Sequence, residues 1–186
     1  MVVNQVARVD RSTAALVWAA IVIVLADAIA YLLLIRGQGG EPPDLAATVP
    51  FIAGYIVLMA LLLWLSVLNQ SLLVKLQPAL RAGAAAGLLV LGVVGLWSVG
   101  LPLLVAGVLA TIAAIRALEG PDRSRRVLSE IAAAVIAVTV LVGGFEVTQR
   151  VIVCPPSGNM SGTGSGLITG AYSYECSNGT LTMHSG

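Results

Sequence analysis

The sequence predicts an all-α integral membrane protein with five transmembrane helices and a small, disulfide-stapled outer C-terminal tail that contains a β-hairpin. Three observations predict this fold class. The mean hydropathy is +0.97 and only 10 % of the 186 residues are charged, against about 25 % in an average soluble domain. Long apolar tracts fill residues 1–149. Both cysteines, Cys154 and Cys176, lie in the Gly/Ser-rich stretch 150–186 that follows.

The first two apolar tracts, residues 13–35 and 49–68, each predict one transmembrane helix. Crossing the hydrocarbon core takes about 20 helical residues. The first tract is longer than the roughly 7–15 apolar residues of a signal peptide, and no small-residue cleavage site follows it, so we expect it to be retained. Pro50 stands near the start of the second tract, where a missing N–H costs least.

The third apolar tract, residues 82–115, is too long for one helix. Its roughly 34 residues would form a helix of about 51 Å, which needs a tilt beyond the usual range of about 0–40°. Gly100 and Pro102 supply a break, because Gly accepts a helix C-terminus and Pro begins a helix well. We therefore predict two short spans, 82–98 and 102–117, with a turn at residues 98–101, and a fifth span at 127–147.

The distribution of basic residues tests this count, because cytoplasmic segments carry the excess of Lys and Arg. With five spans and a cytoplasmic N-terminus, the outer segments hold two basic residues, Arg36 and Arg150. The inner segments hold eight: Arg8, Arg11, Lys75, Arg81, Arg116, Arg123, Arg125 and Arg126. A single crossing by the third tract would change the ratio to five to five. The sequence therefore predicts a multi-pass plasma-membrane protein whose C-terminus is extracytoplasmic.

The segment between the second and third spans, residues 69–81, leaves two interpretations open. Its leucines recur at rough helical spacing between Lys75, Gln77 and Arg81. It could be an interfacial helix on the inner face, broken at Pro78, or an extension of the second helix into the cytoplasm.

The outer tail, residues 150–186, predicts a disulfide between Cys154 and Cys176, because an oxidising compartment allows one to persist. The loop closed by this bond is worth roughly 3 kcal/mol in the chain-entropy model. Residues 155–166 are too polar and Gly-rich to fold by themselves. Alternating residues around Asn178-Gly179 then predict a β-hairpin.

Asp27 is the one acidic residue deep inside a predicted span. Such a residue costs at least ~2.5 kcal/mol to insert, so it should face protein or a water-filled cavity. Tyr55 and Thr139 are its expected partners at the same depth, and a basic residue of a partner subunit is a further possibility. A proton or cation site is the functional alternative. We favour a structural or assembly role, because no further ionisable groups line a path.

Two other sets of residues predict helix packing and an interfacial contact. Glu146 and Arg150 are spaced to form an ion pair across one turn at the outer end of the fifth helix. Small residues let helix backbones approach closely, and five glycines line the third and fourth helices: Gly83, Gly87, Gly92, Gly95 and Gly107.

The sequence excludes several classes of function. The spans contain no His, and the chain has no Cys-x-x-Cys motif and no P-loop, so we expect no metal, haem or other cofactor and no enzymatic activity. A formal net charge of +1 gives no field that would recruit nucleic acid. Arg outnumbers Lys nine to one, a bias typical of GC-rich bacterial genomes.

We expect an accessory or assembly subunit of a larger bacterial membrane complex. Its expected partners are the lipid bilayer and either another membrane protein or a second copy of itself. The alternatives are a small ion- or proton-coupled transporter or channel that uses Asp27, and a sensor whose tail reads the outer redox state through Cys154 and Cys176.

Overall fold

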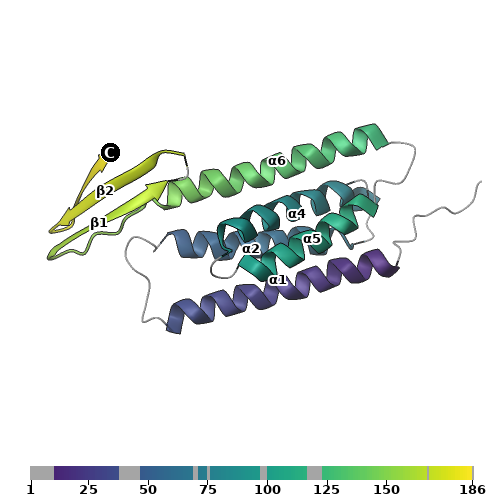
Figure 1. Ribbon diagram of the computed structural model, residues 1–186, viewed down its shortest axis with the longest axis horizontal. Helices are drawn as coiled ribbons and strands as arrows, with labels where there is room; N and C mark the ends of the chain where they lie inside the picture. The colour runs from purple at the N-terminus through teal and green to yellow at the C-terminus, as the bar shows by residue number, and fades with distance from the viewer. Residues whose placement is uncertain are drawn as a thin grey trace, which may run out of the picture. The chain divides into compact units, whose positions relative to one another are not determined.

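The computed structural model describes residues 11–37, 47–68, 71–74, 76–96, 100–116, 123–166 and 168–185. These residues are mostly helical, with one small antiparallel sheet and one disulfide (Figure 1). The helices are α1 (Arg11–Gly37), α2 (Thr48–Leu65), the single turn α3 (Ser71–Val74), α4 (Gln77–Val94), α5 (Gly100–Arg116) and α6 (Arg123–Thr148). The strands are β1 (Asn159–Gly166), β2 (Gly170–Ser177) and β3 (Thr180–Ser185).

Four of the described helices, α1, α2, α4 and α6, are long and apolar enough to cross a membrane. The apolar helix α5 has 17 residues, one fewer than the 18 of α4. The chain divides into two compact units. The first comprises Met1–Ile29 and Ile56–Val138, and the second comprises Ala30–Tyr55 and Thr139–Gly186. The boundary predicted from composition, at residues 149–150, falls inside the second unit.

The long third tract forms two helices, as predicted, and α4 and α5 pack against each other as a hairpin within the first unit (Figure 1). The N–H of Gly100 donates to the carbonyl of Gly95 at 2.7 Å and joins the two helix ends. Pro102 lies in the first turn of α5, where its missing N–H costs nothing. Residues 98 and 99 of the predicted turn lie outside the described residues.

Helix α4 begins at Gln77 and not at residue 82, and the interpretation of segment 69–81 as an extension of the second helix is wrong. Helix α2 ends at Leu65, so it does not extend through the segment. Pro78 breaks no helix, because it stands in the first turn of α4, a position that favours proline. The separate helical turn in this segment is the four-residue α3.

The sheet of the second unit has the strand order β1-β2-β3 and is antiparallel throughout. As predicted, β2 and β3 form a hairpin around Asn178-Gly179, whose φ angles are +47° and +82°. Two positive φ angles are what a tight two-residue turn requires. Within residues 155–166, which are predicted not to fold by themselves, Asn159–Gly166 forms a strand that pairs with the whole of β2.

Tyrosine rings explain how a Gly/Ser-rich segment forms β1. Gly162 lies opposite Tyr174, and Gly164 lies opposite Tyr172. A Cβ atom at either glycine would overlap the ring of the opposite tyrosine, so each ring covers a glycine backbone. The small core of the sheet contains Ile152, Cys154, Met160, Tyr172, Tyr174, Cys176 and Leu181. Segment 155–166 therefore forms a strand because β2 supplies the apolar surface that it lacks.

Candidate functional site

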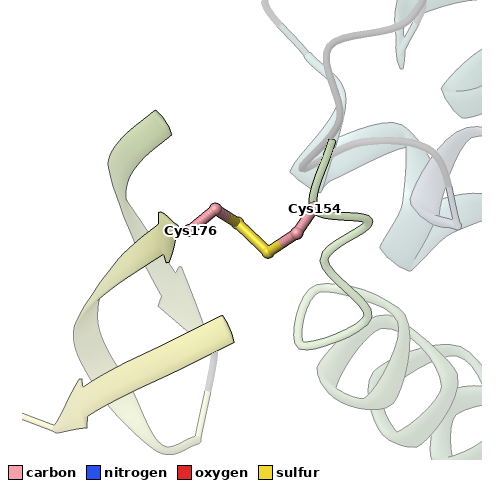
Figure 2. Close-up of a disulfide and its surroundings, with 2 residues drawn as sticks. All are labelled: Cys154 and Cys176. Carbon is pink, nitrogen blue, oxygen red and sulfur yellow. A yellow bond between two sulfur atoms is a disulfide. The ribbon is translucent and has the colours of Figure 1, made fainter. Parts of the chain in front are cut away.

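The candidate functional site is the C-terminal cap, defined as residues 151–185. Its disulfide joins Cys154, in the non-helical segment after α6, to Cys176 of β2 (Figure 2). The two Cα atoms are 5.6 Å apart. The structure thus contains the predicted disulfide, and it ties the middle strand of the sheet to the chain that leaves α6.

Hydrogen bonds add to this covalent tie. The Tyr172 hydroxyl donates to the backbone carbonyl of Gln149 at 2.5 Å, directly after α6. The N–H of Asn178 donates to the carbonyl of Gly158 at 3.1 Å, which holds the β2–β3 turn against the start of β1. The sheet is therefore fixed to the end of α6 at several points.

Glu146, near the C-terminal end of α6, also contacts residues that are distant from it in the sequence. The predicted ion pair with Arg150 is present, with Nη2 3.9 Å from Oε1. The carboxylate also accepts the N–H of Ile168 on Oε2 at 3.2 Å and the hydroxyl of Thr169 on Oε1. A Cβ at Gly166 would overlap the same carboxylate. Glu146 thus holds the β1–β2 turn, and the sequence gives no sign of this contact because the partners are some twenty residues apart.

Asp27 is buried, with 5 % of its surface exposed. It belongs to a stripe of buried residues that recur every three or four positions along α1 and therefore share one face: Val17, Ala20, Val24, Asp27 and Ala28. Its Oδ2 atom has no hydrogen-bond partner among the described residues. The carboxyl group therefore faces protein.

The predicted partners of Asp27 remain a prediction. Asp27 belongs to the first compact unit, whereas Tyr55 and Thr139 belong to the second. Tyr55 is buried, and its ring contacts the ring of Phe51 with centroids 6.2 Å apart. Thr139 lies in the exposed part of α6.

Four of the five predicted packing glycines lie close to another helix of the first unit, or to the end of that helix. A Cβ at Gly92 would be 2.8 Å from the backbone nitrogen of Leu104, and one at Gly107 would be 2.9 Å from the Leu89 side chain. Gly95 accepts the hydrogen bond from Gly100. Gly83 lies against α6, where a Cβ would be 3.3 Å from the carbonyl oxygen of Ala133. The fifth, Gly87, is buried in α4.

Arg81 has a structural role that the sequence did not reveal. It is buried, and its Nη2 and Nε atoms donate to the carbonyl of Ser66 at 3.1 Å and to the Ser66 hydroxyl at 3.3 Å. Gln77 donates to the carbonyl of Leu68 at 3.1 Å. The bonds to the carbonyls of Ser66 and Leu68 satisfy two acceptors just beyond the C-terminus of α2, where the helix dipole also favours a positive charge. Recognising Pro78 as a helix start would have placed Arg81 in α4.

The described residues contain no group of three or more His, Cys, Asp and Glu side chains that could hold a metal ion. Comparisons with the models of known protein families, with curated proteins and with solved structures give no match for this chain.

Proposed function

We propose that the chain is a multi-pass membrane protein whose five spans are α1, α2, α4, α5 and α6. The sorting of side chains by size supports this. Helix α5 buries mostly glycine and alanine: Gly100, Leu103, Ala106, Gly107, Ala110, Ala113 and Ala114. It exposes larger apolar residues: Leu101, Val105, Val108, Ile112 and Ile115. Large apolar residues on the outside and small ones at the helix contacts suit packing in lipid, where small residues let backbones approach.

The helix lengths are compatible with this proposal. At 1.5 Å per residue, α4 and α5 are about 26 Å long, close to the ~30 Å hydrocarbon core. The longer helices α1 and α6, with 27 and 26 residues, fit by tilting or by extending beyond the core. The bias of basic residues supports a cytoplasmic N-terminus and a cap on the outer face of the plasma membrane.

The role we propose is that of an accessory or assembly subunit, with the cap as its interaction surface. One face of the sheet exposes polar side chains from all three strands, with Ala171 beside them: Ser161, Thr163, Ser173, Glu175, Thr182 and His184. Strands β1 and β3 each have one edge that pairs with no strand of the described chain, and such edges accept further strands. The observation that carries this proposal is that a disulfide and the Glu146 and Tyr172 hydrogen bonds hold this surface in one position.

Native purification tests the accessory role. The tagged protein is extracted from its own membrane in mild detergent, and proteins that co-purify at fixed stoichiometry are identified by mass spectrometry. We expect a specific membrane partner that is retained by the wild type and lost by the double variant Cys154→Ser/Cys176→Ser. Recovery of the wild type as a monomer, without a stoichiometric partner, contradicts the role.

Coupled transport is the second candidate, and Asp27 is the observation that favours it. A buried carboxyl group whose Oδ2 lacks a partner among the described residues is a group that a proton or cation can bind inside a membrane. Liposomes containing this chain alone test this alternative. Uptake of protons or ions that Asp27→Asn abolishes would establish transport and overturn the accessory role.

A further inference from the structure

The β1–β2 turn lies level with the last turn of α6. The N–H of Ile168 is 3.2 Å from Oε2 of Glu146, and Glu146 stands two residues before the end of the helix at Thr148. The adjacent Tyr172 hydroxyl binds the carbonyl of Gln149. Figure 1 shows the end of β1 beside the end of α6, with the strands running away from it. At about 3.3 Å per residue, the eight residues of β2 carry Asn178-Gly179 about 26 Å from this turn.

The end of the cap nearest α6 exposes large apolar side chains. The cap exposes four large apolar side chains in its described part: Val151, Val153, Ile168 and Met183. Val151 closely follows α6, and Ile168 stands on the turn that Glu146 holds. Val153 adjoins Cys154, whose disulfide to Cys176 places it toward the other end of β2. Ile168 is 72 % exposed, whereas the opposite turn is the polar pair Asn178-Gly179.

We propose that Val147, Val151 and Ile168 form a patch that contacts the outer leaflet and holds the cap against the membrane surface. This inference rests on the proposed membrane insertion. Val147, in the last turn of α6, is 64 % exposed, so the patch continues the apolar surface that α6 turns to lipid. Glu146 then has a defined task, because it holds Ile168 at the depth of the lipid headgroups and glycerol backbone.

Arg150 favours lipid over a protein as the occupant of this patch. Its side chain is 51 % exposed and stands between Val147 and Val151 in the sequence. A guanidinium group beside branched apolar side chains matches an interface where lipid phosphates lie above acyl chains. With this patch on the leaflet, the polar face of the sheet stays available to a partner.

Fluorescence of single tryptophans tests the inference in the full chain. In a Trp18→Phe/Trp64→Phe/Trp97→Phe background, one tryptophan is introduced as Ile168→Trp and the protein is reconstituted into phosphatidylcholine vesicles. Lipid brominated in the upper acyl chain quenches tryptophans that touch the bilayer, and aqueous iodide quenches those exposed to water. Ile136→Trp, on the exposed surface of α6, reports membrane insertion. Thr182→Trp, on the polar face of β3, reports the aqueous phase.

We expect Ile168→Trp to lose emission in brominated lipid and to resist iodide, as Ile136→Trp does, and Thr182→Trp to behave in the opposite way. Quenching of Ile136→Trp but not of Ile168→Trp by brominated lipid overturns the inference alone. Resistance of Ile168→Trp to both quenchers also overturns it, because protein would then cover the patch. Failure of Ile136→Trp to respond to brominated lipid overturns the proposed membrane insertion. A non-reducing gel verifies the disulfide in each variant, and Val151→Trp decides the question if Ile168→Trp does not form it.

Discussion

Gly162 of β1 lies directly opposite Tyr174 of β2, and the tyrosine ring covers the glycine. The neighbouring pair on the same face, Gly164 and Tyr172, repeats the arrangement. Tyr174 is almost fully buried, although its strand belongs to a small sheet at the end of the chain. Cross-strand pairs of this kind are the unit of sheet stability, at roughly 0.2–1 kcal/mol each. The two pairs thus hold β1 to the rest of the cap.

Gly162→Val should destabilise the cap, because the new side chain would occupy the space of the Tyr174 ring. Overpacking of this kind costs about 1–3 kcal/mol. Hydrogen exchange of the β1 and β2 amides should accelerate by the corresponding factor. Thr163→Val is the matched control, since residue 163 is exposed on the polar face and valine favours strands. Equal protection in Gly162→Val and Thr163→Val would show that the ring does not cover the glycine.

Loss of the disulfide should loosen the cap and leave the helices intact. The double variant Cys154→Ser/Cys176→Ser removes the constraint on a loop of 22-residue separation, worth about 3 kcal/mol in the chain-entropy model. Limited proteolysis should then cut within the cap at a much higher rate, while the helical content measured by circular dichroism stays unchanged. A cap equally resistant with and without the bond would contradict the staple. If reduction of the disulfide in the wild type lowers the resistance of the cap to proteolysis, the cap behaves as a redox sensor requires.

Gly92→Ala should destabilise the α4–α5 hairpin. The added methyl group would lie 2.8 Å from the Leu104 backbone nitrogen and 3.0 Å from the Gly100 carbonyl oxygen, and backbone cannot move aside as a side chain can. We expect a cost of about 1–3 kcal/mol, larger than the ~1 kcal/mol that alanine gains in helix propensity. Gly143→Ala is the control, because nothing lies within 4 Å of its Cβ. The midpoint of thermal unfolding in detergent should fall for the first variant and not for the second.

Arg81→Lys should lower stability although it keeps the charge. A lysine cannot reproduce the two bonds of the guanidinium to the carbonyl and hydroxyl of Ser66. Leaving one buried acceptor unpaired costs about 1–3 kcal/mol. Arg116→Lys is the control, since Arg116 is exposed and donates to Ser12 at 3.3 Å. The same thermal measurement checks the pair, and equal midpoints for the two variants would contradict the role of Arg81.

The features of the fold that depend only on residues adjacent in the sequence could be predicted from the sequence. The break between α4 and α5 follows from helix length and from Gly100 and Pro102, which act on their own backbone. The β2–β3 hairpin likewise follows from Asn178-Gly179, where two positive φ angles are needed.

Contacts between distant parts of the chain could not be predicted in the same way. Strand β1 exists because tyrosines of β2 cover its glycines, and no property of segment 155–166 alone indicates that. The hydrogen bonds of Arg81 have no local signal, because its partner, Ser66, lies fifteen residues away in the sequence. The spacing of Glu146 and Arg150 predicts their ion pair, which the structure contains, but not the two further bonds that the carboxylate accepts from the β1–β2 turn.

The most direct test of the account is to determine on which side of the membrane the connection between α5 and α6 and the C-terminus lie. Fusions of alkaline phosphatase, active only outside the cytoplasm, and of a green fluorescent protein that matures only in the cytoplasm are made after residue 120 and after residue 186. Five spans predict fluorescence at residue 120 and phosphatase activity at residue 186. Fluorescence without phosphatase activity at residue 186 would put the cysteines in the reducing cytoplasm and contradict both the five-span topology and the outer cap.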